Sequence, residues 1–302
     1  ASTPDDVELR TNVANLARTR IDPTTCSPDE AIIRVDELFA LLFGSADPAR
    51  SDRRLQREYL NVLRHLGNYS LQIPADAQAG NAAAVSHFLD EQRSFETAKR
   101  PRLALGVEWA RRLAKEAPDD HESARELAQA CHSLADCLVM LKDPACEPLA
   151  LEADHTLSVA LAADRQNTNL PKILATVLIV RANYRIGLAN RTGISMLEHY
   201  KAWRVALELS TRALRLDPGT KPMGDIIRQQ LRRLTGQGVE GRESADVRLE
   251  LARIATQLRA TNRDTDPFTA HLTEQGDLPD AGCWIDAATA ASRRARNSGD
   301  AA

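Results

Sequence analysis

Aromatic residues are scarce in this chain of 302 residues, at 4% of the sequence. Strands favour aromatic and β-branched side chains, whereas Ala and Leu, which are plentiful here, favour helices. Alternating β-branched runs joined by Asn-Gly or Asp-Gly turns are also missing. The composition therefore predicts an all-α protein. It also argues against single-stranded nucleic acid as a ligand, because such strands stack on aromatic side chains.

Strong net charge and long apolar runs are missing as well. The formal net charge is -3, so we expect no general attraction to nucleic acid or to an anionic membrane. The longest apolar run, residues 173–180, is far shorter than the roughly 20 residues that span a bilayer. We expect no direct membrane insertion of this segment. Because the chain begins at Ala1 and not at Met, it is interpreted as a processed protein or an excised domain, with room for a transmembrane helix upstream.

Recognisable catalytic and metal-binding motifs are absent from the sequence too. It contains no P-loop, no G-x-S-x-G, no H-E-x-x-H, no C-x-x-C and none of the protein-kinase motifs, and its histidines are scattered. We therefore predict a protein that is not an enzyme and that needs no cofactor or metal. The alternative is an enzyme whose active site is assembled from scattered residues without a local motif.

The cysteines leave two interpretations open. Cys137 and Cys146 flank a predicted helix connection, where a helical hairpin could bring them close enough for a disulfide. The other interpretation is that the cysteines are buried free thiols that act as small apolar residues.

Periodicity and breaker residues predict the helices. Ser27-Pro28-Asp29-Glu30 is a helix start, with a capping Ser, a Pro in the first turn and acidic residues after it. Residues 172–188 are apolar nearly all round, which predicts a buried helix. The Lys99-Arg100-Pro101 segment is predicted to break the chain between two helices, residues 1–26 to be extended or a short helix, and residues 75–83 to be a loop. The predicted helices span about 27–43, 51–71, 84–98, 102–116, 121–141, 146–163, 172–188, 195–216, 223–234 and 244–260.

Small residues recur along these helices with a period of about 50 residues. One set lies in the middle of a helix, each before Asn or Asp: Gly67, Ala135 and Ala182. A second set lies early in the following helix: Gly106, Ala153 and Ala206. Antiparallel helices approach closely only where small residues face each other, so the pattern predicts a stack of helical pairs.

This pattern resembles the tetratricopeptide (TPR) repeat, with a small residue midway along helix A, one early in helix B and a Pro at the end. The best match is residues 206–218, where Ala213 is the late small residue and Pro218 the last position. The long period resembles the repeat arrays beyond the membrane segment of some bacterial receptor-type serine/threonine kinases, as does the Cys283-Trp284 pair. The resemblance covers residues 52–220 and implies a right-handed α-solenoid of antiparallel helix pairs. We accordingly divide the chain into an N-terminal lead-in and capping helix (1–50), TPR-like repeats (51–220), C-terminal capping helices (221–290) and a disordered tail (291–302).

In the tetratricopeptide family, helix A lines a concave groove, and the resemblance assigns ligand-binding positions here. They are Asn61, Arg64 and Asn68 in the first repeat, Gln129, His132 and Asp136 in the second, and Asn183 in the third. Amides bind an extended peptide backbone and arginine binds a carboxylate. The alternative is that these residues form an ordinary solvated helix face.

Arg181 and Arg185 are possible additional ligands. They occupy positions that Leu134 and Leu138 hold in the preceding repeat. Because the helix is apolar, each arginine either forms an ion pair with an acidic residue inside the stack or faces the groove. The ion pair is favoured, because burying an unpaired charge costs free energy.

The sequence therefore predicts a non-catalytic domain that binds a protein or peptide and no nucleic acid. The kinase resemblance implies a periplasmic sensor region of a bacterial membrane signalling protein. The alternative is a cytoplasmic scaffold or chaperone for a multiprotein assembly such as a secretion system. The oligomeric state is left open.

Overall fold

A computed structural model describes residues 4–48, 51–118, 120–164, 166–222, 225, 250, 253 and 254. Across these residues the protein is all-α, with nine α-helices and no strand, which confirms the predicted fold class at this level. The chain divides into two compact units, a first unit of residues 1–180 and a second unit of residues 181–302. Most of the predicted 223–234 and 244–260 helices, Cys283-Trp284 and the 291–302 tail lie outside the described residues.

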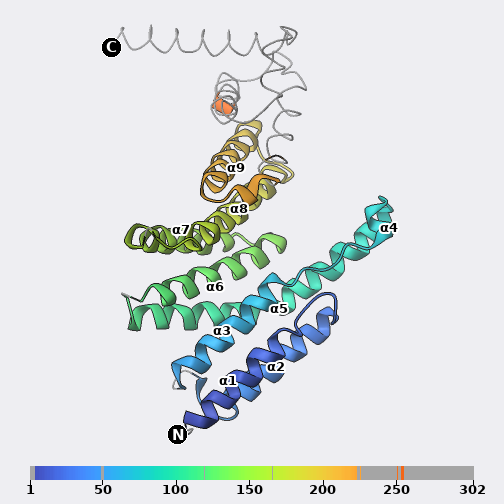
Figure 1. Ribbon diagram of the computed structural model, residues 1–302. Coiled ribbons are helices and arrows are strands. Elements are labelled where there is room, and N and C mark those ends of the chain that lie inside the picture. The colour runs from blue at the N-terminus through green and yellow to red at the C-terminus, as the bar shows by residue number, and fades with distance from the viewer. Residues whose placement is uncertain are drawn as a thin grey trace, which may run out of the picture. The chain divides into compact units, whose positions relative to one another are not determined.

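Helices α1 (Pro4–Arg18), α2 (Pro28–Phe43) and α3 (Arg53–Asn68) pack on one another at the N-terminal end of the first unit (Figure 1). The predicted start of α2 is confirmed, because the Ser27 hydroxyl accepts from the Glu30 amide and the Glu30 carboxylate accepts from the Ser27 amide at 2.7 Å. Gly44 ends this helix with a positive φ of 55°. Of the two alternatives for residues 1–26, the short helix is the one observed.

A single helix of 35 residues, α5 (Ala82–Glu116), follows the short α4 (Ala75–Gln78). The predictions of two helices over 84–98 and 102–116, and of a loop throughout 75–83, are therefore wrong. Pro101 removes one hydrogen bond from the helix, at a cost of about 3 kcal/mol. The Arg102 guanidinium donates to the backbone carbonyl of Ala98 at 2.8 Å beside this site. Burial of Leu103 beside the proline offsets part of the local cost.

Helices α6 (His121–Met140) and α7 (Cys146–Ala163) pack against each other, and α6 also packs against α3 and α5. Helix α8 (Leu170–Ala189) runs across the boundary between the units, and its many buried residues confirm the prediction from its apolar sequence. In the second unit, α9 (Met196–Leu216) begins at a capping Ser195 and is followed by the 3-10 helix η2 (Pro218–Thr220).

Four aromatic rings from α2, α3 and α5 meet in the core of the first unit. Ring centroids of Phe39, Phe43, Tyr59 and Trp109 lie 5.2–6.1 Å apart, several of them edge to face. This cluster gathers a third of the few aromatic side chains of the sequence in one place and holds the three helices together.

The repeated small residues are sites of close packing. A Cβ on Gly67 would lie 2.6 Å from the Cβ of Ser133 on α6, and one on Gly106 would lie 2.6 Å from Leu63 Cδ1 on α3. The alanines of the same pattern are fully buried: Ala135, Ala153, Ala182, Ala206 and Ala213. The prediction that Gly67 lies in the middle of its helix is wrong, because α3 ends at Asn68. Tyr69 then leaves the helical conformation, and its hydroxyl donates to the Cys26 carbonyl at 2.6 Å.

We predict that Gly67→Ala destabilises the protein by about 1–3 kcal/mol, because the added methyl group overlaps Ser133 at the α3–α6 contact. Gly187→Ala is the matched control, since a Cβ at this helical position meets nothing within 4 Å. It is expected to stabilise by up to about 1 kcal/mol through the reduced entropy of the unfolded chain. Urea unfolding followed by far-UV circular dichroism measures both values. Equal stability of the two variants would contradict the close approach.

The cysteines of the first unit favour the thiol interpretation. Cys137 is a free thiol whose S–H donates to the backbone carbonyl of Glu96 at 3.2 Å, so no disulfide joins Cys137 to Cys146. Burial raises the pKa of Cys131 and of Cys137 to about 12. Both side chains are therefore protonated and unreactive at neutral pH.

Candidate functional site

A hollow of about 340 Å³, which includes space open to solvent, lies between α3, α5 and α6 of the first unit. Part of its lining carries no polar side chain and comes from α3 and α5: Leu60, Leu63, Leu103 and Gly106. Ala130 and polar residues from α3 and α6 complete the wall: Asn61, Arg64, Glu126, Gln129 and Ser133. The enclosed part of the hollow is small, about 20 Å³, and the rest is open to solvent.

The structure brings three of the predicted ligand-binding residues together in this hollow. Asn61 and Arg64 lie one turn apart on α3, and Gln129 faces them from α6. They come from the first and the second predicted repeat.

Arg64 differs from its basic neighbours in its pairing. Arg18 binds Glu58 at 3.1 Å, and Arg125 Nε binds Glu122 at 2.9 Å. In the described part of the chain, no carboxylate lies within ion-pairing distance of Arg64. Burial lowers the pKa of Arg64, the charges of Arg125 and Arg18 lower it further, and the charges of Glu122 and Glu58 act in the opposite direction. A guanidinium stays protonated at neutral pH in any case. Arg64 thus carries a half-buried positive charge at the hollow that no carboxylate contacts directly among these residues, although Glu122 and Glu58 act on it from a longer distance.

Glu126 is a residue of the hollow that the sequence analysis did not select. Its side chain is only 7% exposed, and its nearest basic group is Arg57, with Nε 3.4 Å from Oε2. That Oε2 accepts no hydrogen bond from the residues that the structure describes. Burial raises the pKa of Glu126 to about 7, although Arg57 acts in the opposite direction. The available signal was its position three residues before Gln129, on the same face of the helix.

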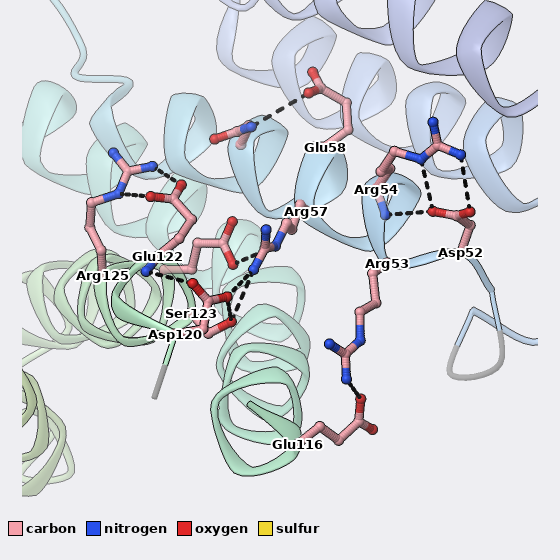
Figure 2. Close-up of polar contacts among 12 residues, drawn as sticks. Asp52, Arg53, Arg54, Arg57, Glu58, Glu116, Asp120, Glu122, Ser123 and Arg125 are labelled. Carbon is pink, nitrogen blue, oxygen red and sulfur yellow. Dashed lines mark hydrogen bonds and ion pairs between the residues drawn. The ribbon is translucent and has the colours of Figure 1, made fainter. Parts of the chain in front are cut away.

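Arg57 is engaged mainly at the N-terminus of α6 (Figure 2). Its Nη2 donates to the Asp120 carboxylate at 2.5 Å and to the Ser123 hydroxyl at 3.1 Å. The Ser123 hydroxyl in turn donates to Asp120, and these hydrogen bonds lower the pKa of Asp120. This network joins α3 to α6 and leaves Arg57 only partly available to Glu126.

Three predicted residues of the first two repeats do not line the hollow. Asn68 is exposed at the end of α3, and His132 and Asp136 lie further along α6. His132 is half-buried, with its Nδ1 buried and without a hydrogen bond among the described residues. Burial lowers the pKa of His132, opposed by the charge of Asp136. His132 is therefore neutral at pH 7.

The predicted residues of the third repeat belong to the second unit. Arg181, Asn183 and Arg185 are half-buried on α8. The two interpretations of the arginines, structural ion pair or ligand-binding group, stay predictions.

The hollow combines one cationic group, two amides and a buried carboxyl with a lining that is otherwise mostly apolar. This set suits an acidic group on an otherwise apolar or neutral segment, because the guanidinium and the amides donate hydrogen bonds to carboxylate oxygens. No cluster of three or more metal-ligating side chains occurs among the described residues. Within those same residues, no helix has the length and hydropathy needed to cross a membrane.

Comparison with known proteins finds no family model that matches this sequence and no matching curated protein. The likeness to tetratricopeptide repeats and to receptor-kinase repeat arrays thus remains a resemblance carried by the spacing of small residues.

Proposed function

We propose that this chain is a non-catalytic domain that binds a protein or peptide through an acidic group seated in the hollow between α3, α5 and α6. The observation that carries the proposal is Arg64, a half-buried cation that faces the hollow with no acidic partner among the described residues. A buried charge without a counter-ion costs free energy, and an acidic ligand removes that cost. Asn61 and Gln129 supply the neighbouring hydrogen-bonding groups.

The proposed architecture is a right-handed α-solenoid of the tetratricopeptide type. Two observations within the first unit support it. Gly67 and Gly106 each lie where a neighbouring helix approaches closely, as expected of the small residues of such repeats. The short connection between α6 and α7, which pack on each other, suits an antiparallel helical pair.

The proposed setting is the periplasmic sensor region of a bacterial membrane signalling protein such as a serine/threonine kinase, supported by the long repeat period. The second candidate is a cytoplasmic scaffold or chaperone for a multiprotein assembly. The free thiol of Cys137 favours this second setting, in which cysteines are kept reduced. Capture of partners on the immobilised chain from cell-envelope and cytosolic fractions separates the two settings by the fraction that holds the partner.

We predict that Arg64→Ala weakens the binding of an acidic peptide by roughly ten- to a hundredfold, the loss expected for a charge-assisted hydrogen bond of about 1.5–3 kcal/mol. The probe is a fluorescein-labelled peptide of alternating Glu and Gly, measured by fluorescence anisotropy at pH 6.5, and its Gln version is the neutral reference. Arg53→Ala is the matched control, because Arg53 lies on the same helix but pairs with Glu116 in an exposed position outside the hollow. Equal affinities of the wild type and of Arg64→Ala would reject this site.

A further inference from the structure

We propose that Glu126 links acid binding in the hollow to the uptake of a proton, so that the site binds its acidic partner more tightly as the pH falls. This inference rests on the proposed function of the hollow and adds the regulation of that site. It also names the residue that accepts the proton, the carboxylate of Glu126 on α6.

The geometry of Glu126 supports this role. The side chain is more than nine-tenths buried, lines the hollow, and has one carboxylate oxygen without a hydrogen bond from any described residue. Arg57, 3.4 Å away, already donates to Asp120 and to Ser123. An ionised carboxylate in this position has lost its hydration, and Arg57 compensates its charge only in part. The free energy of the ionised form therefore rises relative to that of the protonated form.

Charges on α3 and on α6 with its N-cap act on Glu126, and Arg64 of α3 lines the same hollow. Arg57 of α3 favours its ionised form. On α6 itself, Arg125 also favours it, whereas Asp120 and Glu122 oppose it. Helix α5 contributes only Leu103 and Gly106 to the hollow, and α7, which also packs on α6, contributes no lining residue. Burial outweighs these charges and leaves the pKa of Glu126 at about 7.

A bound acid places a second negative charge beside Glu126 and raises its pKa further. Below pH 7 the group is already protonated in the free protein, and binding needs no proton. Above pH 7 the free protein must take up a proton to bind, so the affinity falls with rising pH, by at most about tenfold per pH unit. The nearby His65 and His132 do not interfere, because burial lowers the pKa of each from its ordinary value of 6.5.

The experiment measures the affinity of the Glu-Gly peptide for the full chain between pH 6.5 and 8.5, a range in which the peptide carboxylates stay ionised. We expect the wild-type affinity to fall by about tenfold or more over this range. Glu126→Gln copies the protonated form, and it is expected to bind with the wild-type affinity of pH 6.5 at every pH. Glu122→Gln, which removes a neighbouring charge but leaves Glu126 in place, is expected to keep the pH dependence.

A second measurement needs no ligand. In protein labelled with carbon-13 at the glutamate side-chain carboxyl carbons, the resonance that Glu126→Gln removes is expected to titrate near pH 7. Titration of that resonance near pH 4.5 would overturn the proton linkage, whatever the peptide does.

The possible outcomes with the peptide are distinct. If the peptide binds the wild type and Glu126→Gln with the same pH dependence, the linkage is wrong and the proposed function stands. If the peptide binds at no pH, both the proposed function and the linkage are wrong.

Discussion

Replacing Lys99 with methionine is expected to destabilise the first unit by about 3–5 kcal/mol. The Lys99 and Glu96 side chains are 3% and 8% exposed, with Nζ and Oε1 2.8 Å apart. The Lys99 ammonium also donates to the Tyr69 carbonyl at 3.4 Å and lies 4.8 Å from the ring centroid of Phe95. Methionine replaces the apolar stem of Lys99 but leaves the Glu96 carboxylate buried without its counter-charge. Urea unfolding followed by circular dichroism measures the loss.

Two controls identify the buried charge as the cause. The double variant Glu96→Leu/Lys99→Met removes both charges and is expected to recover most of the lost stability. Burial raises the pKa of Glu96 even with Lys99 present, and loss of Lys99 raises it further. Because a folded-state pKa above the ordinary value makes folding less favourable as the pH rises above about 4.5, the deficit of Lys99→Met is expected to shrink between pH 8 and pH 5. A deficit of the same size at both pH values would argue against an uncompensated carboxylate.

Trp109→Ala is expected to cost about 3–5 kcal/mol of unfolding free energy. Trp109 is buried among Phe39, Phe43 and Tyr59, with ring centroids 6.1, 5.2 and 5.3 Å away. Since the sequence has few aromatic residues, this one cluster carries much of the packing between α2, α3 and α5. The measurement is again urea unfolding of the full chain.

Trp109→Phe is the matched control, because a phenyl ring preserves part of the edge-to-face contacts. It is expected to cost clearly less, about 1–2 kcal/mol. A Trp109→Ala variant within 1 kcal/mol of the wild type would show that the ring cluster does not hold these helices together.

Local signals predicted the ends of several helices well. Ser27 caps its helix as expected, because capping depends on a hydroxyl and a backbone amide a few residues apart. The continuous path of α5 through Pro101 was not predictable in this way. The backbone cost of the proline is a local property, whereas its compensation comes from the tertiary burial of neighbours such as Leu103.

The candidate site was predicted in part. Helical spacing and the family resemblance selected Asn61, Arg64 and Gln129, which the hollow brings together. The same reasoning could not separate Gln129 from His132, because the two share one face of α6 and only the packing of α3 and α5 decides which turn of that face borders the hollow. Glu126 was missed for a related reason. A glutamate on a helix is normally expected to be exposed, and its burial here results from the packing of neighbouring helices, which the sequence does not show.

Helix α5 is long enough to project from the first unit at one end (Figure 1). Its 35 residues extend over about 50 Å, and its N-terminal end projects with α4 beyond the neighbouring helices of the first unit (Figure 1). The other end is clamped by the rings around Trp109 and carries Gly106 in the lining of the hollow. The rod is most compliant at Pro101, where one backbone hydrogen bond is missing. Bending of the projecting end relative to the clamped end is therefore expected to concentrate at Pro101.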